Sequence, residues 1–179
     1  MARKPAHRKP PRRATTPPPR LLGIDPGTRA AGFGIVELLG PEIRLVACGV
    51  LKPPARLPLA QRLAAIFAGL EQLVALHRPV AGAIEETFAG RNPKSSIAMG
   101  EGRGVALLSL ARAGVPLREF SPAEVKKAVT GHGAASKELV ARMVCARLRL
   151  AEPPQPADVT DALAVALALA HRWPADGRF

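Results

Sequence analysis

The sequence predicts one α/β domain in which helices cover the faces of a mixed β-sheet. At 179 residues the chain is long enough for one such domain and too short for two full ones. Apolar residues make up 47% of it and aromatic residues 3%, so we expect a core of Ala, Leu, Val and Ile. Strand-like segments come first and then alternate with helix-like ones, an order that favours a mixed sheet flanked by helices.

Three strands are predicted at the start of the domain. Leu21–Asp25 is a short apolar run that is broken by Pro26-Gly27, which is typical of a buried strand followed by a turn. Ala31–Leu39 and Ile43–Leu51 are also strand-like and are joined at Gly40-Pro41. The three segments together predict an antiparallel meander.

Helices and strands are then expected in turn. Between Leu59 and Val74 apolar residues recur at the spacing of an amphipathic helix. Ser121 opens a capping box with Pro122 at the first helical position, which predicts a helix to about Thr130. The other predicted elements are helices at Leu57–Leu76, Ser96–Ala113, Ser136–Leu148 and Asp158–Ala170, and strands at Val80–Glu86 and Val115–Phe120. Small residues in the helix 96–113 suggest close packing against another helix.

Residues 1–20 differ in composition from the rest, and we expect the folded domain to span 21–179. They hold seven of the 26 Lys and Arg, six prolines and no acid, which predicts a disordered segment. The remainder has 19 basic against 14 acidic residues, so the net charge of +12 overstates the charge of the domain. The segment is either a solvated extension without a role or an arm that binds phosphates.

The cysteines and the apolar runs bear on the location of the protein. Cys48 and Cys145 are far apart and form no CxxC motif, which suits a reducing cytosol. The longest apolar run, Ala162–Ala170, has nine residues and is expected to be a buried helix, because a bilayer span needs about 20. We therefore expect a soluble cytoplasmic protein that does not bind membranes.

Acidic residues stand at the ends of two predicted strands. Asp25 ends the first strand, where it either caps the following turn or binds a cation. Glu85 and Glu86 end the fourth strand in the same way. Because strand residues alternate between the two faces of a sheet, one of this pair can share the face of Asp25, and spacing does not choose between them.

Two further acids open the last predicted helix. Asp158 and Asp161 are three residues apart and therefore lie on one helical face. Either residue alone is explained by the helix dipole. Four acids at element ends, none with an obvious basic partner, favour a hard cation such as Mg²⁺ or Mn²⁺ if they converge. Two such ions can activate a water and stabilise the leaving oxygen in phosphodiester hydrolysis.

Four stretches of the chain form an ordered set of motifs. The first is LLGIDPGTRAAGFGIVE at 21–37. The others are AIEETFAGRNPKSS at 83–96 with MGEGRGVAL at 99–107, SPAEVKKAVTGHGAASKELV at 121–140, and PADVTDALAVALA at 156–168. In this order they resemble the motifs of the RuvC family of crossover-junction endodeoxyribonucleases, the bacterial Holliday-junction resolvases. The resemblance covers residues 21–172 and implies an RNase H-like fold, a five-stranded mixed sheet flanked by helices.

The resemblance also assigns the acids. The first catalytic aspartate of the family falls on Asp25, and its glutamate falls on Glu85 and not on Glu86. The acids of the last helix fall on Asp158 and Asp161. All four are implied to be catalytic and to hold two Mg²⁺ ions, with Mn²⁺ as a substitute. On this basis we expect Asp25 to bridge the two ions, and Glu85 with Asp161 or Asp158 to complete their shells.

The DNA contacts and partners implied by the resemblance follow from the same motifs. Phe88 matches an aromatic residue that contacts unstacked bases at the junction centre, or else is an ordinary core residue. Lys126 and Lys137 match lysines that hold DNA phosphates, and Arg91 fits a phosphate contact. The implied partners are four-way junction DNA, a second copy of the chain in a symmetric homodimer, and the RuvA–RuvB branch-migration complex. The implied reaction is paired nicking of strands of like polarity.

Three other interpretations remain to be weighed. GIDPGT also resembles a phosphate loop of actin-like and sugar-kinase ATPases, but those proteins need roughly twice this length, a second phosphate loop and an adenosine motif. A binding module of the same fold without catalysis would be expected to lack some of the four acids. A nuclease of the same fold acting on RNA would carry a similar acid set, so substrate choice distinguishes it.

Overall fold

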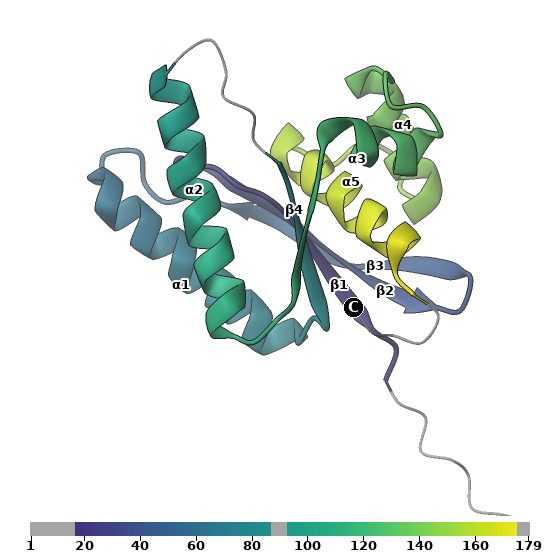
Figure 1. The fold of residues 1–179 in the computed structure, drawn as a ribbon, viewed down its shortest axis with the longest axis horizontal. Coiled ribbons are helices and arrows are strands. Elements are labelled where there is room, and N and C mark those ends of the chain that lie inside the picture. Colours follow the sequence, from purple (N-terminus) through teal and green to yellow (C-terminus); the bar gives the residue numbers. More distant parts are fainter. Residues whose placement is uncertain (1–16, 87–92, 175–179) are drawn as a thin grey trace, which may run out of the picture.

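Within the described part of the chain, five strands and five helices follow one another in the predicted order. The computed structural model describes residues 17–86 and 93–174, and Figure 1 shows their arrangement. The element bounds are β1 (Arg20–Asp25), β2 (Ala31–Leu39), β3 (Glu42–Leu51), α1 (Leu59–His77), β4 (Ala81–Glu85), α2 (Pro93–Arg112), β5 (Leu117–Phe120), α3 (Pro122–Thr130), α4 (Lys137–Leu148) and α5 (Ala157–Arg172).

The strands form one mixed sheet in the order β3-β2-β1-β4-β5. The pairs β1–β2 and β2–β3 are antiparallel, which confirms the predicted meander, whereas β4 is parallel to both β1 and β5. In the β1–β4 pair, Ile24 lies opposite Ile84. The carboxyl ends of these two central strands therefore meet at the same edge of the sheet.

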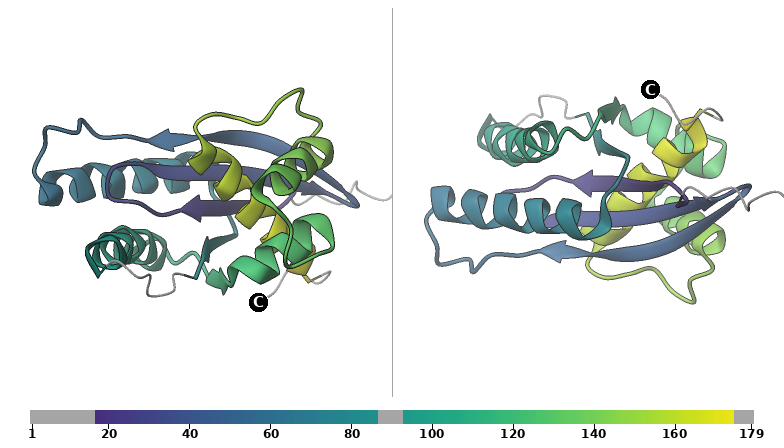
Figure 2. Two further views of the ribbon diagram at one scale, coloured as in Figure 1. Left: turned by 90° about the horizontal axis from the view of Figure 1, so that it is seen from above. Right: turned by 90° about the horizontal axis from the view of Figure 1, so that it is seen from below.

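Helices cover both faces of the sheet, and each face has its own core. On one face Leu22, Ile24 and Ile35 pack with residues of α1 and α2, such as Ile66 and Leu110. On the other face Leu21, Val36, Ala81, Ala83 and Phe120 pack with residues of α3, α4 and α5. Figure 2 shows the sheet between these two layers. Successive residues of β1 thus belong to opposite cores, as the period of two in a strand requires.

Helix α5 lies against the middle of the sheet and is buried along most of its length. Its residues from Ala162 to Leu169 are at most 2% exposed, which confirms the buried helix expected there. Glycines in the strands make this close approach possible, because a Cβ at Gly23 would overlap the backbone of α5 at Ala162 and Ala166. At Gly34 a Cβ would lie 2.6 Å from the side chain of Leu163.

Several element ends differ by one to three residues from the prediction, and proline accounts for the clearest cases. Helix α1 begins at Leu59, because Pro58 is its N-cap and Leu57 donates its N–H to the carbonyl of Pro54 in a turn. Strand β5 begins at Leu117 because Pro116 has no N–H to donate. Strand β1 begins one residue early, at Arg20.

Helix α1 differs from the expectation that no segment is long and apolar enough to cross a membrane. Among the described residues it is the one helix long and apolar enough to do so by length and composition alone, with a mean hydropathy of 1.3. It carries Arg62 and Glu71, however, and packs on the sheet through Ile66, Leu70 and Val74. Its apolar stripe therefore has a partner within the domain.

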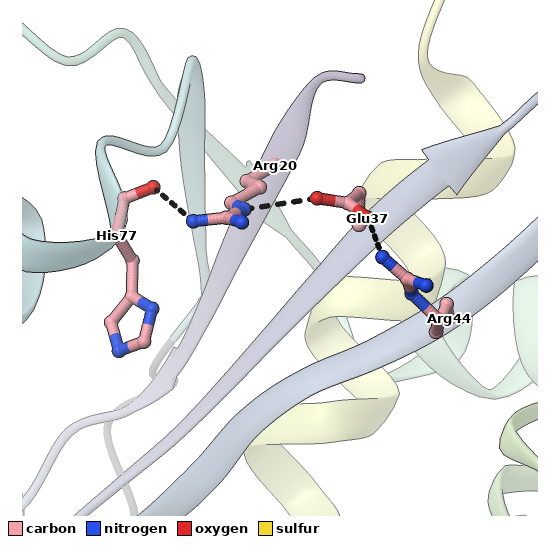
Figure 3. Close-up of polar contacts among 4 residues, drawn as sticks. All are labelled: Arg20, Glu37, Arg44 and His77. Carbon is pink, nitrogen blue, oxygen red and sulfur yellow. Dashed lines mark hydrogen bonds and ion pairs between the residues drawn. The ribbon is translucent and has the colours of Figure 1, made fainter. Parts of the chain in front are cut away.

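A buried acid at the amino end of β1 has two arginine partners, as Figure 3 shows. Glu37 on β2 is 3% exposed. Arg20 donates from Nε to Glu37 Oε1 at 3.1 Å and from a terminal nitrogen to the carbonyl of His77 at 3.4 Å, and Arg44 on β3 pairs with the other Glu37 oxygen. These guanidinium groups hold the pKa of Glu37 below its usual value. The cluster ties β1, β2 and β3 to the end of α1.

Candidate active site

Asp25 and Glu85 lie on the same face of the sheet, at the edge where β1 and β4 end. Asp25 follows Leu21 and Gly23, which face α5, at intervals of two residues. Glu85 follows Ala81 and Ala83, which belong to the same core. Glu86 lies beyond the end of β4, and its N–H donates to the carbonyl of Phe120 at 2.8 Å. Register therefore selects Glu85 as the glutamate beside Asp25.

The first turns of α5 bring two more acids to this edge. Gly32 is the β2 partner of Asp25, and a Cβ at Gly32 would overlap the backbone of Asp158. The absence of a side chain at Gly32 thus lets the start of α5 lie directly beside the end of β1. Asp161 follows one turn later on the same side of the helix.

A cavity of about 200 Å³ opens where these elements meet. Three of its lining residues are acids (Asp25, Glu85 and Asp161), two are lysines (Lys126 and Lys137), and the others are Pro122, Val125, Val140 and Ala164. Five of the residues singled out in the sequence therefore share one cavity. Asp158 is not among the lining residues, although it is close enough to act on Asp25 electrostatically.

Burial and mutual repulsion disfavour the simultaneous ionisation of the carboxylates. The pKa of Asp25 is raised to about 7, first by burial and then by the charges of Asp161, Asp158 and Glu85, against a lowering by Lys137. The pKa of Glu85 is raised by burial and by Asp161, whereas Lys137 and Lys126 lower it. Cationic charge placed in this cavity would relieve the repulsion.

The expectation that none of the four acids has a basic partner is wrong for Asp161. Lys137 Nζ donates to Asp161 Oδ2 at 3.3 Å. The ion pair, together with Asp25 and Glu85, raises the pKa of Lys137. Lys137 is the first residue of α4, with Ser136 as the N-cap, so its backbone is fixed while its side chain, 80% exposed, reaches across to α5.

Two contacts that the sequence analysis did not single out hold the loop after Asp25. Arg62 on α1 donates from Nε to the carbonyl of Thr28 at 3.1 Å and from a terminal nitrogen to that of Leu57 at 2.8 Å. Gly102 on α2 lies so close to Gly27 that a Cβ there would be 2.8 Å from the Gly27 carbonyl carbon. The contacts of Arg62 with Thr28 and of Gly102 with Gly27 have no signal in the sequence, because each joins segments more than 30 residues apart.

Known proteins are similar to this chain in sequence and in fold. The chain matches the RuvC family, described as crossover junction endodeoxyribonuclease RuvC, over residues 21–171. The chain belongs to the RuvC family. It is 46% identical over 151 residues to the crossover junction endodeoxyribonuclease RuvC of Heliobacterium modesticaldum, covering 84% of this chain and 93% of that protein. It is 49% identical over 148 residues to the protein of the same name from Dehalococcoides mccartyi, covering 83% and 89%.

A solved RuvC structure extends the similarity to three dimensions. The structure of T. thermophilus RuvC in complex with a Holliday junction substrate superposes with a TM-score of 0.81 and 38% sequence identity, covering 86% of this chain and 93% of that chain. Together with the five-stranded mixed sheet, this confirms the RNase H-like fold implied by the sequence motifs.

The donor set of this RuvC-family chain suits a hard divalent cation in its chemistry. Asp25, Glu85 and Asp161 present carboxylate oxygens to one cavity, and oxygen ligands are those that Mg²⁺ and Mn²⁺ prefer. Within residues 17–86 and 93–174, no three His, Cys, Asp or Glu side chains are already gathered at the spacing of metal ligands. The acids thus converge on a common cavity without being drawn together at coordination distance.

Two of the DNA contacts implied for the RuvC family fall outside the described residues. Phe88 and Arg91 lie in the segment 87–92, so their assignments stay predictions. Lys126 and Lys137 are both described and both line the cavity. They come from different helices, α3 and α4.

Proposed function

We propose that this chain is a structure-selective endonuclease that resolves Holliday junctions by hydrolysing phosphodiester bonds of four-way junction DNA, in DNA recombination and repair. The observation that carries the proposal is the convergence of Asp25, Glu85 and Asp161 on one cavity that also has Lys126 and Lys137 in its wall. An acidic centre with lysines beside it suits a phosphodiester, because the lysines attract the phosphate and the acids can hold cations. The relatives that carry the RuvC name support the substrate class.

Divalent cations complete the proposed site. Asp25, Glu85, Asp161 and Asp158 would hold two magnesium ions, for which manganese would substitute, and these would supply water activation and stabilisation of the leaving oxygen. The raised pKa of Asp25, about 7, supports a cation there, because burial and then the neighbouring carboxylates disfavour its ionised form. Lys126 and Lys137 would hold non-bridging phosphate oxygens, and Val125 and Val140 form part of the apolar lining of the cavity.

Paired, symmetric nicking requires two sites in a fixed relation, and we propose a homodimer. One face of α2 is unoccupied in the described parts of the chain: Ile97 is 63% exposed and Leu108 54%. Gly100 and Gly104 lie between them on the same face, with open space where a Cβ would stand. A second copy of the helix would bury both apolar side chains and approach closely over the glycines, in an isologous contact. Association with the RuvA–RuvB complex is a further proposal, which comes from the family, and a cytoplasmic location is one that comes from the widely separated Cys48 and Cys145.

Cleavage of a synthetic four-way junction tests the function. The junction is incubated with the protein beside a linear duplex and single strands of the same sequence, with Mg²⁺ or with a chelator. We expect paired nicks in the four-way junction but not in the duplex or the single strands, and only in reactions that contain Mg²⁺. A preference for linear duplex or for RNA, or cleavage in the presence of chelator, would show that the proposed function is wrong.

Asp25→Asn tests the site within the same assay. The substitution removes a carboxylate from the lining of the cavity but keeps its size, so we expect cleavage to be lost while junction binding is kept or strengthened. Binding is measured by gel shift in the absence of divalent cations. Cleavage by the variant at the parental rate would rule out Asp25 as a catalytic residue.

A further inference from the structure

A second cavity adjoins the catalytic one. It has a volume of about 400 Å³ and lies between α4, the start of α5 and the segment that joins them. Lys137 and Asp161 line both cavities, so their ion pair forms the partition between the two. A strand of DNA that has one phosphate in the catalytic cavity would therefore have a neighbouring nucleotide at the mouth of this one.

The chemistry of the second cavity differs from that of the first. Ala141, Pro153 and Ala157 give it small apolar walls. Its charges balance, since Lys137 and Arg142 are opposed by Glu138 and Asp161. A neutral cavity with apolar walls is poorly suited to another phosphate or to a metal ion. It suits the flat, weakly polar surface of a base or a deoxyribose, which gains from contact with apolar side chains.

The dimensions agree with this occupant. Ala141 lies four residues after Lys137 on α4, which is about 6 Å along the helix axis. Neighbouring nucleotides of one DNA strand are about 3.4 Å apart along the duplex axis. The apolar wall is therefore within two nucleotide steps of the lysine that faces the catalytic cavity.

We propose that this cavity binds the sugar and base of a nucleotide that flanks the scissile phosphate in the cleaved strand. The proposal rests on the proposed function and adds a specificity-determining subsite to it. Ala141 and Ala157 contact the nucleoside, and exposed Arg142 holds the phosphate on its far side. The exposed Gln155 amide, which both donates and accepts hydrogen bonds, reads the base edge.

The test combines a substitution that fills the cavity with junctions that lack the base proposed to bind in it. Ala141→Leu places a larger side chain in the cavity, and single abasic residues are placed one or two nucleotides to either side of the cleavage site. We expect one abasic position to slow parental cleavage about tenfold, which corresponds to about 1.4 kcal/mol. Ala141→Leu should slow cleavage of the intact junction to a similar extent, with little further loss from that abasic residue.

Controls separate the subsite from general effects. Ala128→Leu makes the same change on α3, in a different cavity lined by Lys127 and Arg147, and should keep both the parental rate and the full abasic penalty. Ala157→Leu replaces Ala141→Leu if the latter does not fold by circular dichroism. Equal abasic penalties in parental and filled proteins, or no abasic penalty at any position, would overturn the proposal. Failure of the parental protein to cut the intact junction would instead overturn the proposed function.

Gln155→Ala tests base reading independently of cavity size. On junctions that vary in base at the position identified by the abasic scan, the parental protein should cleave the preferred sequence several-fold faster than the others. The variant should cleave all four at similar rates, with little change in junction affinity. A preference that persists unchanged in Gln155→Ala would show that the cavity does not read the base through this residue.

Discussion

Among single residues, Asp25 combines a place in the lining of the cavity with a pKa near neutrality. Its pKa is about 7 in the folded protein, against 3.8 for an unperturbed aspartate. Between these two values the unfolded chain ionises Asp25 while the folded protein still holds its proton. Stability without cations should therefore fall as pH rises from about 4 to 7 and then stay low.

Asp25→Asn removes this dependence, because asparagine does not ionise. In chelator we expect the variant to gain stability over the parental protein, with a gain on the order of 2 kcal/mol larger at pH 8 than at pH 5. Thermal unfolding at the two pH values measures it, and at pH 8 Mg²⁺ should raise the Tm of the parental protein more than that of the variant. A gain independent of pH would contradict the raised pKa of Asp25.

Glu85 and Glu86 form a matched pair for a second test. Glu85→Gln removes a carboxylate from the cavity, and we expect the cleavage rate to fall by about a hundredfold or more. Glu86→Gln changes a residue that does not line the cavity and should leave the rate close to parental. Single-turnover cleavage of the junction at saturating protein measures both. Equal losses in the two variants would contradict the strand register.

The sequence predicted which acids form the site better than it predicted which residues lie beside each of them. Alternation along β4 predicts that Glu85 and Glu86 lie on opposite faces, but the choice needs the pairing of β4 with β1, which no local pattern contains. The resemblance to the RuvC family motif supplied the choice of Glu85 over Glu86. The partner of Asp161 was missed because Lys137 is 24 residues away on another helix, and an exposed lysine has no distinguishing neighbours in sequence.

At the scale of elements, the position of α5 depends on glycines in the strands beneath it. Gly32→Ala would place a methyl group against the carbonyl of Asp158 and push the start of α5 away from the end of β1. We expect a loss of stability of about 1–3 kcal/mol from this overpacking and a larger loss of cleavage. Denaturant unfolding with junction cleavage measures both, and tolerance of Gly32→Ala would contradict the tight contact.

The order and type of the elements could be predicted because periodicity and capping are local. The capping box at Ser121 and Glu124 is present as expected. The small residues of α2 were only partly understood. Gly102 packs against the loop after β1, and Gly100 and Gly104 face open space among the described residues. A glycine in a helix indicates that another segment can approach the helix closely, but it does not identify that segment.

For the whole molecule, the proposed dimer makes a prediction about α2. Leu108→Glu places a charge on the exposed face between the two copies, and we expect it to convert a dimer into a monomer. The monomer should nick junctions singly, with loss of paired cleavage. Light scattering coupled to size-exclusion chromatography measures the mass, and Leu76→Glu, at an exposed leucine of α1, serves as the control. A parental protein that is monomeric, or a Leu108→Glu protein that stays dimeric, would contradict this face as the interface.

Total charge predicted a polyanionic partner only loosely, since seven of the 26 basic residues lie in the first twenty positions. The fold class followed from element order, whereas the assembly of the cavity from β1, β4, α3, α4 and α5 could not. Its residues are separated by up to 139 positions, between Asp25 and Ala164. Tertiary contacts over such separations leave no trace in composition or spacing.

The arginine pair around Glu37 has a practical consequence for shortening or extending the protein at its amino end. Pro19 accepts a backbone hydrogen bond from Leu38 at 3.0 Å, and Arg20 supplies one of the two charges that neutralise a buried carboxylate. A fusion partner or a cleavage site can therefore be joined before Pro19 without touching the sheet. A fusion partner joined at Leu21 would replace Arg20, and of the two arginines Arg44 alone would then pair with Glu37. Keeping Pro19 and Arg20 therefore preserves both the hydrogen bond to Leu38 and the ion pair with Glu37, whereas starting the chain at Leu21 removes both.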